Sequence, residues 1–164
     1  MELSFELLTL LFIAASLAGF VDAAAGGGGL ITLPVLMLSG MTPVLDEDIY
    51  IFCSARPDVA QTLFKDARGI FIEEEGTTLV LSLERAEALG FDTGMPMRRI
   101  VLMVHSALDG VGLTAVVATA LAEQDIPCNV IAAFHHDHIF VPEKQAEKAL
   151  SVLQGVQKRA QARG

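Results

Sequence analysis

The first third of the chain differs from the rest in its pattern of hydrophobic and polar positions. Residues 3–21 are apolar except for Glu6 and a few small Ser and Thr side chains, and no Lys or Arg precedes Arg56. A helix of this length reaches about 28 Å, which is close to the hydrocarbon thickness of a bilayer. The pattern therefore predicts a hydrophobic, transmembrane-like N-terminal helix and a membrane-associated chain.

The glycines at 26–29 interrupt this apolar pattern, because each Gly costs a helix about 1 kcal/mol relative to Ala. Residues 30–38 are apolar again, but they contain Pro34 and are too short to cross a bilayer, which is typical of a half-helix. A secretory signal is disfavoured because the chain opens with Glu2 and Glu6 instead of positive charge. We assign residues 1–45 to this hydrophobic leader.

From Asp46 onward, short alternating segments and amphipathic segments take over. The order strand-helix-strand-strand-helix occurs twice, which predicts an α+β fold of two tandem ferredoxin-like units with antiparallel sheets and helices on one face. The expected units are residues 46–92 and 98–158, followed by a tail at 159–164. Expected strands cover 49–54, 69–74, 77–82, 98–105, 128–135 and 136–141, and expected helices cover 57–66, 82–90, 111–124 and a final helix opened by Pro142.

The predicted strand over residues 100–104 is apolar on both faces. Ile100, Leu102 and Val104 point one way, whereas Val101 and Met103 point the other way. A sheet with one open face shows polar residues on that face. We therefore expect the second face to be covered, either by the first half of the chain or by another copy.

Charge and cysteine content narrow the classes of function. The net charge of −9 disfavours nucleic acid, which needs clustered Lys and Arg. Cys53 and Cys128 have no CxxC spacing, so we interpret both as reduced core residues. This interpretation predicts a cytoplasmic location for the part after the leader.

Residues 18–34, with their Ala and Gly runs, resemble the first transmembrane region of the sulfite exporter family of membrane permeases. The resemblance covers about residues 3–44, whereas that family has many more spanning helices. It implies contact with the membrane through residues 3–38 but not a complete pore. Residues 41–45 fit either the end of this segment or the start of the next part, so an accidental gene fusion is one alternative.

Residues 104–113 and 126–142 resemble the ACT domain, a small amino-acid-sensing module of metabolic enzymes. On this resemblance, residues 98–154 form one ACT unit and residues 49–89 a degenerate tandem partner. It implies a non-catalytic regulatory protein that binds a free amino acid at the seam between two units. It also implies ACT pairing within the chain or in a homo-oligomer, and no cofactor.

The loop at 105–112 has physical features of a carboxylate site, since Gly110 and Gly112 permit close backbone approach and a helix begins there. A tight turn with Ser106 or Asp109 capping that helix is the alternative. In the binding interpretation, Asp137 faces the ligand's ammonium group and His135 is a pH-sensitive hydrogen-bonding group. The predicted ligand-binding residues are His105, Ser106, Asp109, Gly110, Val111, Gly112, Leu113, Asn129, His135 and Asp137.

The residues at 135–138, two His followed by Asp and His, invite a metal hypothesis. Alternation along a strand leaves at most two ligands on each face, so we expect no metal site. No nucleophile elbow and no paired carboxylates are present, which predicts that the chain is not an enzyme. The alternative function is a membrane protein or permease fragment carrying an ACT regulatory part. We also expect that deletion of residues 1–44 leaves a folded protein.

Overall fold

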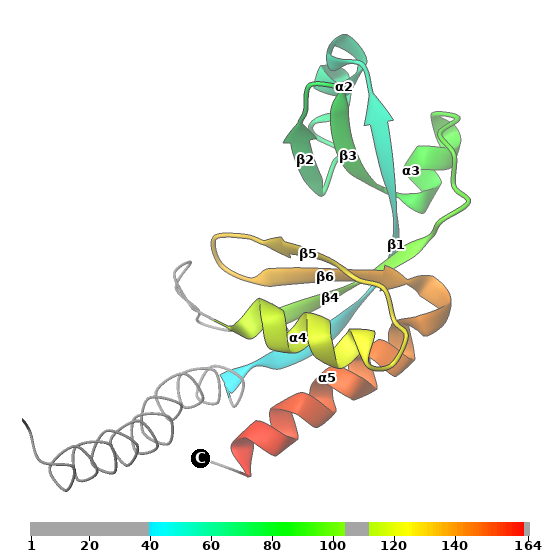
Figure 1. Ribbon diagram of the computed structural model, residues 1–164. Helices are drawn as coiled ribbons and strands as arrows, with labels where there is room; N and C mark the ends of the chain where they lie inside the picture. The colour runs from blue at the N-terminus through cyan, green and yellow to red at the C-terminus, as the bar shows by residue number, and fades with distance from the viewer. Residues whose placement is uncertain (1–39, 104–111, 163–164) are drawn as a thin grey trace, which may run out of the picture.

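The computed structural model describes residues 40–103 and 112–162, which are coloured in Figure 1. They contain six strands, four α-helices and one short 3₁₀ helix. In chain order these are β1 (Thr42–Ala55), α2 (Pro57–Leu63), β2 (Gly69–Ile72), β3 (Thr77–Ser82), α3 (Leu83–Ala88), β4 (Met97–Met103), α4 (Leu113–Ala122), β5 (Asn129–Ala132), β6 (Asp137–Pro142), η1 (Glu143–Gln145) and α5 (Ala146–Gln161).

All six strands form one antiparallel sheet with the order β2-β3-β1-β4-β6-β5. The α+β class is as predicted, but the two units share one sheet instead of having one each. The central strand β1 belongs to both halves, and β4 pairs with each part of it. We call residues 49–96 unit 1, and residues 97–161 together with residues 41–45 unit 2. In Figure 1, unit 1 lies above unit 2, and β1 runs from one to the other.

The strand β1 begins at Thr42, inside the segment that the sequence analysis assigned to the leader. Residues 42–45 pair with residues 100–103 of β4, and the preceding Met41 is fully buried. β3 pairs with β1 only from Tyr50 onward, so among the described strands residues 42–45 pair with β4 alone. A strand edge of this kind tolerates Pro43, which has no N–H to donate. Residues 41–45 are therefore part of unit 2.

Two extra residues bulge out of β1 after Leu45, where the strand passes from unit 2 to unit 1. The Asp46 carboxylate accepts hydrogen bonds from Arg99 Nε at 2.9 Å and from the Tyr50 hydroxyl at 2.8 Å. Arg98 Nε donates to the Asp46 carbonyl oxygen at 2.9 Å. The bulge is thus tied to β4 by two neighbouring arginines.

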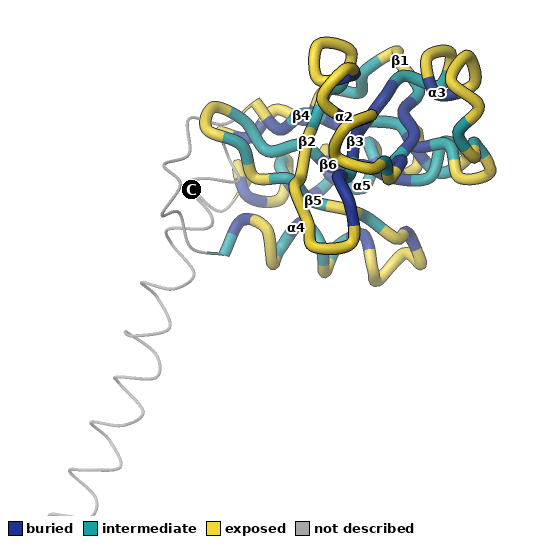
Figure 2. The backbone as a smooth tube through the Cα atoms, turned by 90° about the horizontal axis from the view of Figure 1, so that it is seen from above, coloured by how far each residue is buried: buried dark blue, intermediate teal, exposed yellow. Residues whose placement is uncertain are grey.

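The helices cover one face of the sheet, and each unit has its own core beneath them. Figure 2 shows buried positions (dark blue) along the strands and exposed positions (yellow) mainly in the loops and on outward helix faces. The unit 1 core consists of Ile51, Cys53, Ala60, Leu63, Leu79, Leu81 and Ala86. The unit 2 core consists of Met41, Ile100, Leu102, Leu113, Val117, Leu121, Ile126, Ile139, Val141, Ala146, Ala149, Leu153, Val156 and Ala160.

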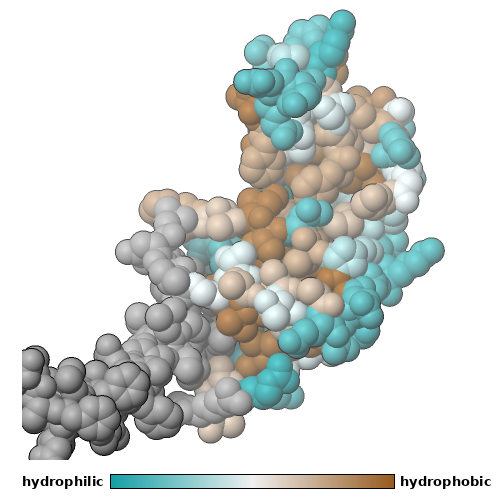
Figure 3. All heavy atoms as spheres, in the orientation of Figure 1, coloured by the Kyte–Doolittle hydropathy of each residue, from teal (hydrophilic) through white to brown (hydrophobic). Residues whose placement is uncertain are grey.

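The opposite, helix-free face of the sheet, which we call the inner face, curls so that its two halves meet. Tyr50, Val80, Met97 and Phe140 form a third buried cluster there, with Phe52 packed against it. The Phe140 ring stands edge-on to the rings of Tyr50 and Phe52, at centroid distances of 5.7 and 5.1 Å. Figure 3 shows hydrophobic residues (brown) gathered where the two units meet. One half of the chain therefore covers the second sheet face of the other at this seam.

Among the residues that the structure describes, unit 1 does not cover the inner face at the far end of β4. Met103 is 45% exposed and Val44 is 47% exposed, although both are apolar inner-face positions. The expectation that the chain's first half covers Met103 is therefore wrong for residues 40–103 and 112–162. What covers the seam instead is the aromatic cluster around Phe140.

No helix within the described ranges has both the length and the apolar character needed to cross a bilayer. The predicted helix over residues 3–21 and the half-helix over residues 30–38 lie outside those ranges.

Candidate functional site

Half of the predicted ligand-binding residues lie outside the described part of the chain. These are His105, Ser106, Asp109, Gly110 and Val111, in the connection between β4 and α4. The other five are Gly112, Leu113, Asn129, His135 and Asp137. They occupy three different places.

Asp137 and the start of α4 lie at the same end of unit 2 and on the same face of its sheet. Asp137 opens β6 opposite Leu102, one residue before β4 ends. The chain returns at Gly112, and Leu113 begins α4 in the same buried cluster as Leu102. Since paired residues of adjacent strands point to the same face, the Asp137 side chain is on the helix-covered side with Leu102. We call Gly112, Leu113 and Asp137 the loop-end site.

The two parts of the loop-end site have opposite polarity. Within the described residues no side chain caps the N-terminus of α4, and the helix dipole favours an anion at its first amides. Burial raises the pKa of the Asp137 carboxyl, and the charges of His138 and His136 offset this in part. Its carboxylate has no side-chain hydrogen bond or ion pair within residues 40–103 and 112–162. A desolvated carboxylate without a partner is suited to a cation.

Gly112 has a φ of +98°, which is in the left-handed region. A side chain there is strained even if space is available for it. Gly112→Val therefore changes the stability of the turn as well as any access to it, and it does not test ligand binding cleanly.

Asn129 lies away from the loop-end site. It begins β5 opposite Phe140, three residues further from the hairpin tip than the residue that pairs with Asp137, and it faces the inner side. That separation is about 10 Å along the strand. Asn129 lines a cavity of about 340 Å³ at the seam, together with Ile51, Phe52, Asp92, Met95 and Met97. The predicted ligand set is therefore divided between the seam and the far end of unit 2.

His135 occupies the tip of the β5–β6 hairpin. It is exposed, and its ring stands edge-on to Phe134 at a centroid distance of 4.9 Å. His138 pairs with Val101, whereas Asp137 pairs with Leu102, so these two neighbours point to opposite faces as alternation predicts. No group of three or more potential metal ligands occurs within the described residues.

Sequence reasoning missed the seam cavity, because its walls come from distant segments. Asp92 and Met95 are in the connector between the units, Phe52 is in β1 and Met97 opens β4. The connector contains Gly94 and Pro96, which are typical of a loop between two units, but such a pattern does not predict a cavity.

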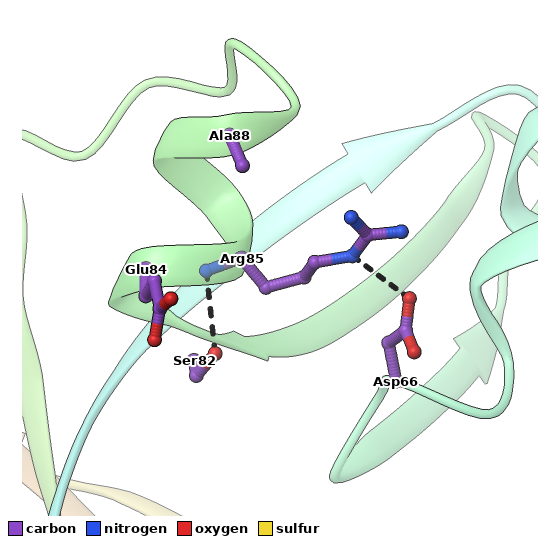
Figure 4. A pocket seen from close by; sticks show the side chains of 5 residues that line it. All are labelled: Asp66, Ser82, Glu84, Arg85 and Ala88. Carbon is purple, nitrogen blue, oxygen red and sulfur yellow. Dashed lines mark hydrogen bonds and ion pairs between the residues drawn. The ribbon is translucent and has the colours of Figure 1, made fainter.

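A second hollow lies on the helix-covered side of unit 1, and polar groups that line it form bonds within the protein. Figure 4 shows Arg85 reaching from α3 toward Asp66, with its Nε 2.8 Å from Asp66 Oδ2. The Ser82 hydroxyl accepts a hydrogen bond from the Arg85 backbone N–H at 3.3 Å and so caps α3. These polar groups already have partners, so we assign no ligand to this hollow.

Comparison with known proteins identifies the class of fold. Models of the ACT domain match residues 29–98 and residues 96–155. A solved structure of a Vibrio cholerae protein of unknown function, described as a possible transport protein, is 40% identical in sequence. The match covers 79% of this chain and 98% of that protein, with a TM-score of 0.70. The chain therefore belongs to the ACT-domain family, as a tandem pair of ACT domains.

More distant structures share the fold alone. An Agrobacterium tumefaciens protein is 17% identical, with a TM-score of 0.56, over 71% of this chain and 89% of its own. The regulatory subunit of aspartate kinase from Thermus flavus is 14% identical, with a TM-score of 0.50, over 71% of this chain and 98% of its own. Neither likeness identifies a ligand.

Short, highly similar matches also connect the chain with membrane transporters. A probable membrane transporter of Escherichia coli K12 is 62% identical over 37 residues, which are 23% of this chain and 14% of that protein. One from Sinorhizobium is 51% identical over 43 residues, which are 26% of this chain and 16% of that protein. The chain spans less than a fifth of the curated relatives that it matches. This supports the predicted resemblance to a permease over a short segment.

Proposed function

We propose that the chain is a non-catalytic regulatory module that binds a free amino acid at the loop-end site of unit 2. The observation that carries this proposal is the position of Asp137, a partly buried carboxylate without a side-chain partner among the described residues, at the same end and face as the start of α4. Membership of the ACT family supports a regulatory role.

The chemistry of the loop-end site fits a zwitterion. The amides of Gly112 and Leu113 hold the ligand's carboxylate, because they lie at the positive end of the α4 dipole. Asp137 holds the ammonium group, and this contact offsets the cost of burying its charge. The predicted ligand-binding residues outside the described ranges stay predictions, namely His105, Ser106, Asp109, Gly110 and Val111. His135 stays a predicted pH-sensitive group.

The shared strands give such a site a route to the other unit. Asp137 pairs with β4, and β4 also pairs with the part of β1 that continues into unit 1. A ligand that shifts β4 therefore acts on both cores, which is what a regulatory pair requires. The fold likeness to an aspartate kinase regulatory subunit is consistent with this role.

A thermal-shift screen of the common amino acids on the full-length protein tests the proposal. At 100 times its dissociation constant, a ligand should stabilise the fold by about 2.7 kcal/mol and raise the melting temperature by several degrees. Asp137→Asn should lose most of that shift, because the ammonium group loses its counter-charge. No shift with any amino acid would contradict the proposal.

The matched control is Asp125→Asn. Asp125 is exposed on the turn after α4 and has a φ of 55°, a conformation that Asn tolerates. This variant removes the same charge without touching the loop-end site, so it should keep the full ligand-induced shift. An equal loss in both variants would indicate a general charge effect instead of binding at Asp137.

A second candidate function follows from the short transporter matches. In this case the ACT pair regulates or accompanies a membrane protein, and residues 3–38 attach the chain to the bilayer. Cell fractionation of the untagged protein distinguishes the two functions. A chain that stays in the membrane pellet after alkaline carbonate extraction supports attachment, and a chain in the supernatant contradicts it.

A further inference from the structure

The inner face carries a group of cationic and imidazole side chains beside its aromatic cluster. Arg99 on β4 and His138 on β6 are on this face, and His136 comes directly before β6. The fourth member is Arg68, which precedes β2 and is close enough for its charge to act on both Tyr50 and His138. These four residues come from both units, and they are a group of basic side chains in a chain whose net charge is −9.

His138 is fixed in position by the sheet. It pairs with Val101 and stands two residues before Phe140 on the same strand face, so its ring is on the inner side next to the aromatic cluster. Its Nδ1 atom is buried and has no hydrogen-bond partner among the described residues, and the same is true of His136 Nδ1. Buried polar atoms of native proteins are nearly always hydrogen-bonded, so two neighbouring unpaired nitrogens indicate a missing polar partner.

The two arginines differ in what they already contact. Arg99 already has partners, because it forms an ion pair with Asp46 and lies over the Tyr50 ring at 5.3 Å. The Arg68 side chain has no ion pair within residues 40–103 and 112–162. Its backbone N–H donates to the Val80 carbonyl at 2.7 Å, which anchors it beside an inner-face core residue.

The charge balance around His138 is positive. Burial lowers the pKa of His138, and the charges of Arg99, His136 and Arg68 lower it further, whereas Asp137 alone acts in the opposite direction. Asp137 points to the helix-covered face with Leu102, so it does not fill the space in front of the imidazoles. An anion on the inner face would supply both the missing hydrogen-bond acceptor and the missing negative charge.

We propose that the inner face binds a small oxyanion, a carboxylate or phosphate group, between the imidazoles of His136 and His138 and the guanidinium of Arg68. Two donors from unit 2 and one from unit 1 then hold the same group, so its binding draws the two halves of the curled sheet together. The partly buried Phe52 and Ile131 lie beside this position and offer an apolar surface to the ligand's body. The site is separate from the loop-end site, which is on the other face.

The test is a titration of the full-length protein with inorganic phosphate and, separately, with propionate, at fixed pH and constant ionic strength. Binding is followed by the imidazole NMR signals of His136 and His138 and by the fluorescence of Tyr50, the single Tyr in a chain without Trp. Saturable changes with one or both anions, and none with chloride, are expected. The anion with the higher affinity tells phosphate from carboxylate ligands.

Arg68→Gln should weaken anion binding at least about tenfold, because it removes a positive charge that no described carboxylate pairs with. The matched control is Arg56→Gln, at an exposed arginine before α2 that pairs with Asp58. It should bind like the wild type. An unchanged melting temperature confirms that Arg68→Gln is folded, as expected for an exposed position. Changes that do not saturate, that chloride reproduces, or that Arg68→Gln leaves intact would each overturn the proposal.

Discussion

The two units share a sheet but differ in the amount of buried side chain that holds their helices against it. Of the described residues, unit 2 buries fourteen in its core and carries the long helix α5, whereas unit 1 buries seven beneath α2 and α3. Those two helices have seven and six residues, fewer than an isolated helix needs in water. Unit 1 therefore depends for its stability on the strands it shares with unit 2 and on the buried aromatic cluster around Phe140.

This difference indicates how stability is distributed. A region with few buried apolar contacts opens at lower free energy than the global unfolding of the chain. We expect unit 2 to be the stable body and unit 1 to open first. Deletions and substitutions in the two units test this order of stability.

The largest effect concerns the N-terminal boundary. Deletion of residues 1–44 was expected to leave a folded protein, but it removes the fully buried Met41 and the strand residues that pair with β4. Loss of the Met41 side chain alone should cost about 2–5 kcal/mol. We now expect the 1–44 deletion to be molten or unfolded and the 1–39 deletion to unfold cooperatively in urea. Equal midpoints for both would show that residues 40–44 do not complete unit 2.

The next effect separates the two cores. Leu153→Ala in α5, at a fully buried site, should lower the global free energy of unfolding by about 2–5 kcal/mol. The matched change in unit 1 is Leu63→Ala, at a site that is 4% exposed. It should accelerate hydrogen exchange in α2 and β3 while α5 keeps its protection. Uniform acceleration in both units would mean that the chain opens as one body.

A substitution in the bulge that joins the two units should have an intermediate effect on stability. Burial raises the pKa of Asp46, but the hydrogen bonds from Tyr50 and Arg99 outweigh it and hold the pKa below its usual value. Asp46→Asn should destabilise the fold by about 1–3 kcal/mol at neutral pH, since it leaves the mostly buried Arg99 without its ion-pair partner.

The pH dependence of this effect has a defined sign. A carboxyl with a lowered pKa stabilises the fold fully above its unfolded pKa, and the contribution is lost as the pH falls through the folded value. The wild type and Asp46→Asn should therefore converge in stability below about pH 4. Asp58→Asn, at an exposed ion pair, is the control and should change stability by less than about 1 kcal/mol at any pH. A constant difference between wild type and Asp46→Asn down to pH 2 would contradict this assignment.

The smallest effect is expected at the uncovered end of β4. Met103→Glu should cost less than about 0.5 kcal/mol, because Met103 is 45% exposed, whereas Met97→Ala at the seam should cost several times more. Urea unfolding and light scattering measure both quantities. A larger loss at Met103, or a lower particle mass, would show that another copy of the chain covers this face.

Local sequence patterns were sufficient to predict the strands and helices whose patterns are regular. β3 has the predicted bounds, Thr77–Ser82, because Gly76 marks the turn before it and Ser82 caps the following helix. The ends of the other strands and helices differ from the prediction by a few residues. The first part of β1 was missed altogether, since Pro43 and three acidic residues at 46–48 argue against a strand by themselves. They are stable there because β3 does not pair with that part of β1 and because Arg98 and Arg99 hold the bulge.

The candidate site was only partly predictable for a related reason. Asn129 and Asp137 are close in sequence and were grouped together, yet strand register and alternation put them about 10 Å apart along the hairpin and on opposite faces. Arg68 and His138 show the converse, because they are far apart in the sequence and yet the charge of Arg68 acts on His138 in the folded chain. Register and curvature depend on the whole sheet, so no local pattern predicts either grouping.

The passage of β1 through both units has a consequence for synthesis on the ribosome. Residues 42–45 leave the exit tunnel first, but their partner β4 and the covering helix α5 emerge more than fifty and a hundred residues later. Unit 1, made of contiguous residues, can start to form in the meantime. The opening strand residues must wait unpaired until the C-terminal helix is complete, so an apolar strand edge stays exposed for most of translation. Slow elongation or a premature stop before α5 would leave that edge available for aggregation.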